Sequence, residues 1–108
     1  MGRKQKLIQE LNSFAVKISQ EYPLQKMILF GSRAKGKHHE DSDVDLLLVS
    51  PKFRKKRRLQ RSPPLYLKWN LNYPVDFLCY TPEEFERKKN KIGIVHEALA
   101  KGIDILKK

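Results

Sequence analysis

Three short apolar segments constrain the fold of this chain more than any other feature. They are Met27–Phe30, Asp43–Val49 and Val75–Tyr80, and each is followed within two residues by a glycine or a proline. Apolar runs of roughly four to eight residues between turn signals are typical of buried strands, whereas helices are usually longer. The sequence therefore predicts at least three strands, and two of them carry acidic residues, which buried strands rarely contain.

Helical patterns lie before and after these strands. Apolar residues recur with helical spacing from Leu7 to Ile18. After the third strand, Thr81-Pro82-Glu83-Glu84 combines an N-cap, a proline at the first helical position and a capping box. The remaining expected elements are a helix from Pro82 to about Lys91, a helix at Ile94–Lys101 and an edge strand at Ile103–Leu106.

The length and composition exclude several classes of protein. At 108 residues, we expect residues 1–108 to form a single domain. The single cysteine, Cys79, excludes an internal disulfide framework and a multi-cysteine zinc site. The apolar runs are far shorter than the roughly 20 residues of a membrane-spanning helix, and the first residues lack the apolar segment of a signal peptide. These features indicate a soluble protein of the reducing cytoplasm, with no membrane partner.

Acidic residues in the second and third strands form a candidate metal site. Side chains alternate along a strand, so Asp43 and Asp45 point to one face, about 7 Å apart. Their mutual repulsion would be offset by Mg²⁺, which takes oxygen ligands from one or two carboxylates. If the third strand is a neighbour, Asp76 joins them, and three carboxylates suit a two-metal site for phosphoryl transfer. The alternative is that these acids at strand ends face water.

A glycine-serine turn follows the first strand. Gly31 lets the backbone turn sharply and approach a ligand closely, and Ser32 is a good helix N-cap. The Ser32 side chain and the N–H groups of the first helical turn can hold a phosphate. Arg33 either reaches that phosphate or lies on the surface. A phosphate cradle beside paired acids predicts a nucleoside triphosphate bound through its metal.

The combined motif is Gly31-Ser32-Arg33-Ala34-x-Gly36, a polar gap, and then Ser42-Asp43-x-Asp45-Leu46. It resembles the signature of the DNA polymerase beta-like nucleotidyltransferase superfamily, and the short chain resembles the minimal nucleotidyltransferase (MNT) members. The resemblance is close from Gly31 to Val49 and looser over Val75–Arg87, where Asp76 falls at the family's third carboxylate. It implies an α/β (α+β) fold with a mixed β-sheet of three to four strands flanked by helices.

The resemblance also implies a reaction and its residues. Asp43 and Asp45 would hold two Mg²⁺, and Asp76 would help bind the catalytic metal and activate an acceptor hydroxyl. Gly31 and Ser32 would hold the triphosphate, with Arg33 as a further nucleotide contact. The implied reaction is in-line attack on the α-phosphate of ATP or another NTP, which transfers a nucleoside monophosphate, AMP from ATP, to a protein or nucleic-acid hydroxyl.

The partners are implied by the family alone. Many minimal members are encoded beside a helical HEPN protein and act as the antitoxin of a toxin-antitoxin pair. Larger members add a second domain, so we expect another chain, or the excursion Lys52–Asn72, to bind the acceptor. The alternative functions are a non-catalytic protein that neutralises a HEPN partner and a basic nucleic-acid-binding module. A homo-oligomer is left open.

Positive charge is concentrated at the start of that excursion. The chain has 23 Lys and Arg against 12 Asp and Glu, a net charge of +11, and seven of the cations fall in Lys52–Arg61 with no acid among them. We expect this basic run to lie next to the site. It is either solvated or binds an anion: an RNA acceptor, the triphosphate or an acidic partner surface. Trp69 and its tyrosine neighbours are expected to pack on the core rather than to stack on bases.

Overall fold

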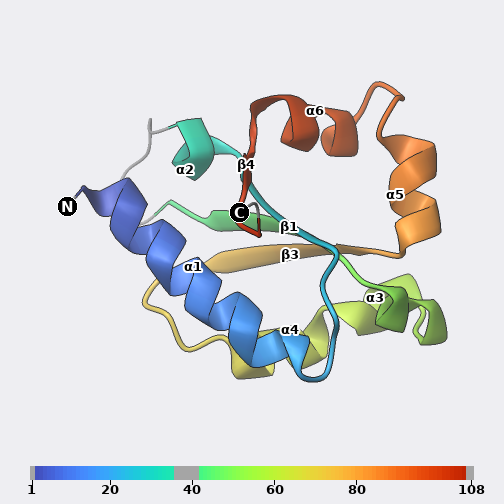
Figure 1. Ribbon diagram of the computed structural model, residues 1–108, viewed down its shortest axis with the longest axis horizontal. Helices are drawn as coiled ribbons and strands as arrows, with labels where there is room; N and C mark the ends of the chain where they lie inside the picture. The colour runs from blue at the N-terminus through green and yellow to red at the C-terminus, as the bar shows by residue number, and fades with distance from the viewer. Residues whose placement is uncertain (1, 36–41, 107–108) are drawn as a thin grey trace.

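The computed structural model describes residues 2–35 and 42–106, in which four strands form one mixed sheet in the order β3-β2-β1-β4 (Figure 1). The strands are β1 (Lys26–Phe30), β2 (Val44–Val49), β3 (Val75–Tyr80) and β4 (Ile103–Asp104). β1 pairs antiparallel with both β2 and β4, whereas β2 pairs parallel with β3. The predicted mixed sheet flanked by helices is confirmed, including its short edge strand.

Helices cover both faces of this sheet (Figure 1). On one face lie α1 (Arg3–Ser19) and α4 (Pro63–Lys68), and on the other lie α5 (Pro82–Lys88) and α6 (Ile94–Lys101). Because side chains alternate along a strand, Leu46 and Leu48 of β2 pack toward α1, while Leu47 and Val49 pack toward α5 and α6. Asp45 has the same parity as Leu47, so its carboxylate belongs to the α5–α6 face.

The excursion after β2 folds into three short helical pieces. They are η1 (Pro51–Lys55), α3 (Arg58–Arg61) and α4. Phe53 and Leu65 are fully buried and anchor the excursion in the core below the sheet. The Trp69 ring packs edge-on against Phe14 and Phe77, with centroid distances of 5.0 and 5.8 Å. The predicted packing role of Trp69 is therefore confirmed.

The predicted start of α5 is confirmed in its hydrogen bonds. Thr81 Oγ1 accepts from the Glu84 backbone N–H at 3.1 Å, and Glu84 Oε1 accepts from the Thr81 backbone N–H at 2.9 Å. The helix ends at Lys88, before the predicted Lys91, because the chain turns through Gly93 to begin α6. Across the described part of the chain, no helix is both long and apolar enough to cross a membrane.

Candidate active site

Two acids are direct neighbours across the parallel strands β2 and β3. In the register of this pair, Asp45 lies beside Asp76, and neighbouring strands are about 4.8 Å apart. Residues in register on parallel strands point to the same face, and Asp43 directly precedes β2. The prediction that the second and third strands are neighbours is confirmed, and it brings the three acids to one end of the sheet.

The Asp45 carboxylate responds to this grouping electrostatically. Burial raises its pKa above the ordinary value, and the negative charges of Asp76 and Asp43 raise it further. Asp45 is half-buried, whereas Asp43 and Asp76 are exposed. This end of the sheet therefore concentrates negative charge that a bound cation would offset.

Gly31 lies against the same carboxylate. The antiparallel register places Phe30 opposite Asp45, so the chain turns at Gly31 directly beside the acid. Gly31 has φ +77°, and a Cβ at this position would overlap Asp45 Oδ2. The turn and the close approach each require glycine. Immediately after it, the exposed Ser32 begins α2 (Ser32–Lys35), so the serine lies at the same end of the sheet as the acids.

Arg33 is buried behind this turn, with 4% of its surface exposed. Its Nε donates to the Ser42 carbonyl oxygen at 3.0 Å, and its guanidinium lies over the Tyr73 ring, 4.8 Å from the centroid. Ser42 precedes Asp43, and Tyr73 lies three residues before Asp76, so Arg33 joins the two segments that carry the acids. The surface interpretation of Arg33 is wrong, because partners that are distant in sequence enclose it.

Tyr73 and Glu10 are site-supporting residues that the motif does not contain. The Tyr73 hydroxyl donates to Glu10 Oε1 at 2.8 Å, and the backbone carbonyl of Tyr73 accepts from Trp69 Nε1 at 2.8 Å. Burial raises the pKa of Tyr73, and the hydrogen bond to Glu10 raises it further. One residue on, the Pro74 carbonyl accepts from the Val44 N–H at 2.8 Å. No sequence signal identifies Glu10, because it lies on α1, 63 residues from its partner.

The donor set fits a hard divalent cation in an open site. Within residues 2–35 and 42–106, no group of three or more His, Cys, Asp or Glu side chains is arranged so that it could hold a metal ion. Asp43, Asp45 and Asp76 instead offer carboxylate oxygens at an accessible end of the sheet. Mg²⁺ is usually bound in this manner, through one or two carboxylates plus waters and substrate phosphates. Gly36 of the motif lies outside the described residues.

The basic run does not lie next to these acids, which corrects the expectation from the sequence. The acids are at the start of β2 and the run follows its end, so the strand separates them by about 17 Å. The run is also not uniformly solvated. Arg61 is 5% exposed, and its Nη1 donates to Glu84 Oε1 at 2.6 Å and to the Cys79 carbonyl oxygen at 3.1 Å. Arg54 pairs with Glu83.

The chain is similar to nucleotidyltransferases in sequence and in fold. Residues 11–101 match the family model of the nucleotidyltransferase domain. The crystal structure of a candidate nucleotidyltransferase from Sulfolobus solfataricus has the same fold, with a TM-score of 0.65 and 20% identity over 94% of this chain and 80% of that chain. Among curated proteins, none matches the sequence significantly. Because the family model spans most of the chain, the protein belongs to the nucleotidyltransferase domain family.

Proposed function

We propose that this domain is a Mg²⁺-dependent nucleotidyltransferase that transfers a nucleoside monophosphate, AMP from ATP, to a hydroxyl of a protein or nucleic acid. Membership of the family supports a transferase that uses an NTP. One observation supports the proposed site. Asp45 and Asp76 are neighbours in parallel strands, and the Gly31 backbone lies against Asp45. The carboxylate pair thus shares one end of the sheet with the turn that we propose to bind phosphate.

Each residue has a proposed task. Asp43, Asp45 and Asp76 would hold two Mg²⁺ ions through their carboxylate oxygens. When bound, the ions neutralise phosphate charge and lower the pKa of the acceptor hydroxyl. The Gly31 N–H and the Ser32 hydroxyl orient the triphosphate. The acceptor oxygen bonds to the α-phosphorus, its proton passes to Asp76, and the bond to the bridging oxygen breaks so that pyrophosphate leaves.

Arg33 has a proposed role that differs from the direct nucleotide contact expected from the sequence. Its guanidinium is engaged by the Ser42 carbonyl oxygen and the Tyr73 ring. We propose that it is a positioning residue, which holds the segment before Asp43 against the segment before Asp76. Catalysis by positioning is sensitive to such contacts, since a displacement of about 1 Å can cost on the order of a hundredfold in rate.

The proposed biological setting is a toxin-antitoxin pair in the cytoplasm, with this chain as the MNT antitoxin and a HEPN-type protein as its partner. The resemblance of the Gly31–Val49 motif to minimal nucleotidyltransferases supports this setting. The partner would supply the acceptor hydroxyl or be neutralised by binding alone.

The test is transfer from labelled ATP, with Mg²⁺, to the HEPN-type protein encoded beside this chain. The double variant Asp43→Asn, Asp45→Asn removes two proposed metal ligands. A matched control, Glu86→Gln with Glu97→Gln, changes the net charge equally on α5 and α6, away from the site. We expect the first variant to lose at least about a hundredfold in transfer rate and the control to retain it.

Two results would count against the proposal. Transfer that survives in the Asp43→Asn, Asp45→Asn variant would exclude the proposed site. Tight binding of the partner by the wild-type protein, without Mg²⁺-dependent ATP binding or label transfer, would instead support the non-catalytic interaction protein. Calorimetry of Mg²⁺-dependent ATP binding gives a readout that does not depend on the choice of acceptor.

A further inference from the structure

The end of the sheet opposite the acids carries positive charge that the domain does not neutralise. The three acids of α5 each have a cationic partner, in the pairs Arg54–Glu83, Arg61–Glu84 and Lys89–Glu86. Among the other cations of these segments, we call five the basic strip: Lys56, Arg57, Arg58, Lys88 and Lys91. Within residues 2–35 and 42–106, none of the five forms an ion pair.

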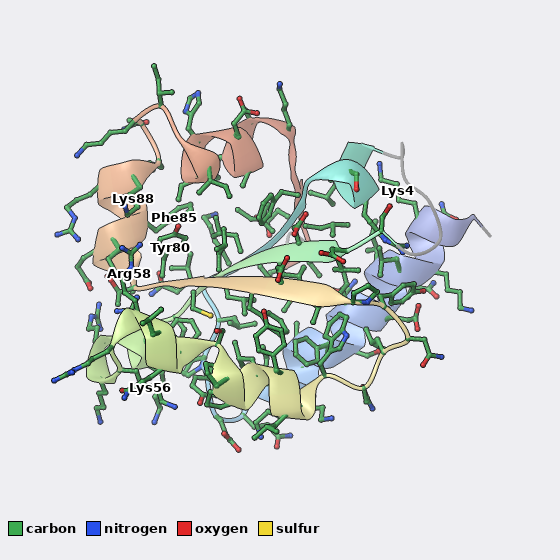
Figure 2. The ribbon with its side chains drawn as sticks, turned by 180° about the vertical axis from the view of Figure 1, so that it is seen from behind. Lys4, Lys56, Arg58, Tyr80, Phe85 and Lys88 are labelled. Carbon is green, nitrogen blue, oxygen red and sulfur yellow. The ribbon has the colours of Figure 1, made fainter. Side chains whose placement is uncertain are left out.

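The basic strip runs along one end of the molecule. Figure 2 shows Lys56, Arg58 and Lys88 along this end, with Lys4 at the opposite end. The Arg58 guanidinium lies over the Tyr80 ring, 5.8 Å from the centroid. Tyr80 also shares a hollow of about 160 Å³ with Lys88 and Lys91. Three cations of the strip, Arg58 of α3, Lys88 of α5 and Lys91 of the turn before α6, therefore lie around Tyr80, the last residue of β3.

Tyr80 and the acids are on the same face of the sheet, whereas Lys56 Nζ donates to the Tyr22 hydroxyl at 3.3 Å on the α1 face. Tyr80 and Asp76 are four residues apart in β3, so their side chains point to the same side, about 13 Å apart along the strand. Between them on that face lies Leu78, which is half-buried. A hollow of about 230 Å³ lies along this part of β3, lined by Leu78, Tyr80, Arg58 and their neighbours. Because Phe77 and Cys79 of the opposite face also line this hollow, it forms a track along the outer edge of β3 from the strip to Phe77, the neighbour of Asp76.

The outer edge of β3 is occupied by side chains, which argues against a peptide adding as a further strand. β3 is the last strand of the sheet, so its outer backbone groups would be available for such pairing. However, Arg61 Nη1 donates to the Cys79 carbonyl oxygen, and the Phe77 N–H donates to the Tyr66 hydroxyl at 3.4 Å. A ligand that follows this track must therefore bind through charge and side-chain contacts. A nucleic-acid backbone meets that requirement.

We infer that the basic strip binds the phosphates of a single nucleic-acid strand, which runs along β3 with its 3′ end toward Asp76. The inference rests on the proposed function for the direction of the strand and for the role of that 3′ end, whose hydroxyl would be the acceptor in transfer. Contacts to phosphates carry no sequence information, so binding should be tolerant of base sequence. RNA and DNA strands of equal length should bind with similar affinity.

The test is fluorescence anisotropy of the intact protein with a labelled single-stranded RNA of about 12 nucleotides, a length within the usual site size for such strands. No Mg²⁺ or NTP is added, so binding is measured independently of transfer. The strip variant is Arg58→Gln with Lys88→Gln. Its matched control is Lys4→Gln with Lys6→Gln, which removes the same charge from exposed positions on α1. Thermal unfolding confirms that each variant folds, and Lys88→Gln with Lys91→Gln provides a second strip variant.

The counterion model gives the expected size of the effect. Each lost phosphate contact lowers the slope of log K against log salt by about 0.7 for a single strand. Losing two contacts should lower the slope by about 1.4 and weaken binding about 25-fold near 0.1 M salt, while the control keeps wild-type binding. A strand with a photoreactive 3′-terminal nucleotide should crosslink to the segment that contains Asp76 and Leu78.

Several results would overturn the inference. They are equal weakening in the strip variant and the control, no RNA binding at about 50 mM salt, and equal binding of a duplex of the same length. Competition by polyglutamate as effective as that by RNA would identify an acidic protein as the occupant. Crosslinking of the 5′ end near Asp76 would refute the direction of the strand. If the wild-type protein binds RNA but transfers no AMP from ATP, the proposed function is refuted and the inferred RNA-binding surface still stands.

Discussion

Replacing Gly31 by alanine tests the close approach of the Gly31 turn to Asp45. Two effects are expected. At φ +77°, a residue with a Cβ costs about 1–3 kcal/mol of stability, and the new Cβ would also overlap Asp45 Oδ2 and displace that carboxylate. A domain of this size has about 5–15 kcal/mol of total stability, so the variant should still fold.

The control for this substitution is Gly93→Ala. Gly93 has φ +157°, a region that is nearly exclusive to glycine with the extended ψ found there, and a Cβ at Gly93 would meet nothing within 4 Å. Both variants should therefore lose about 1–3 kcal/mol in urea unfolding. Only Gly31→Ala has a further effect, because only there does the side chain reach Asp45.

The deciding measurement is Mg²⁺-dependent ATP binding by calorimetry at a temperature where both variants are folded. Disturbing one charged ligand costs about 1.5–3 kcal/mol of binding free energy, so Gly31→Ala should bind ATP about 10- to 100-fold more weakly than the wild type. Gly93→Ala should bind ATP as tightly as the wild type does. Equal ATP affinity in the two variants would refute the reasoning that Gly31 positions Asp45. Equal stability of Gly31→Ala and the wild type would refute the assigned strain.

Three further predictions concern single side chains. Arg33→Lys keeps the charge but loses the hydrogen bond from Nε to the Ser42 carbonyl oxygen and the stacking of the guanidinium on the Tyr73 ring. The variant should lose about 1–2 kcal/mol of stability and bind ATP with Mg²⁺ more weakly. Wild-type ATP affinity would instead favour a direct phosphate contact. The pKa of Asp45 is raised in the folded chain, so ionisation of this carboxyl lowers stability at pH values above its pKa. Asp45→Asn should therefore melt at a higher temperature than the wild type at pH 7 without metal, and the difference should vanish below pH 3.8. A lower melting temperature of the variant at pH 7 would contradict this. Burial raises the pKa of the Cys79 thiol to about 12. At pH 8 a thiol reagent should therefore label the native chain on the order of a thousandfold more slowly than the urea-unfolded chain. Equal labelling rates would refute this prediction.

Local signals account for the elements that the sequence predicted well. The strands β1 and β3 and the start of α5 depend on residues within a few positions of each other, such as the Thr81–Glu84 capping box. The acids were also predictable, because alternation in a strand places Asp43 and Asp45 on one face without reference to the rest of the fold.

Long-range contacts account for the errors. The surface interpretation of Arg33 was wrong because Ser42 and Tyr73, which enclose it, lie outside its local segment. The basic run was expected next to the acids because the two are close in sequence. The direction of β2 places them at opposite ends of the strand. Burial of Arg61 depends on Glu84, 23 residues away.

By itself, the sequence determined which segments become strands and helices, which acids share a face, and that Gly31 stands where a side chain would be strained. These properties follow from periodicity, capping and backbone sterics, which act over a few residues. Only the tertiary structure decided that β3 pairs in parallel with β2 so that Asp76 meets Asp45, and that the cations gather at the other end of the sheet. Strand pairing depends on packing between segments far apart in the chain, and no local pattern specifies it.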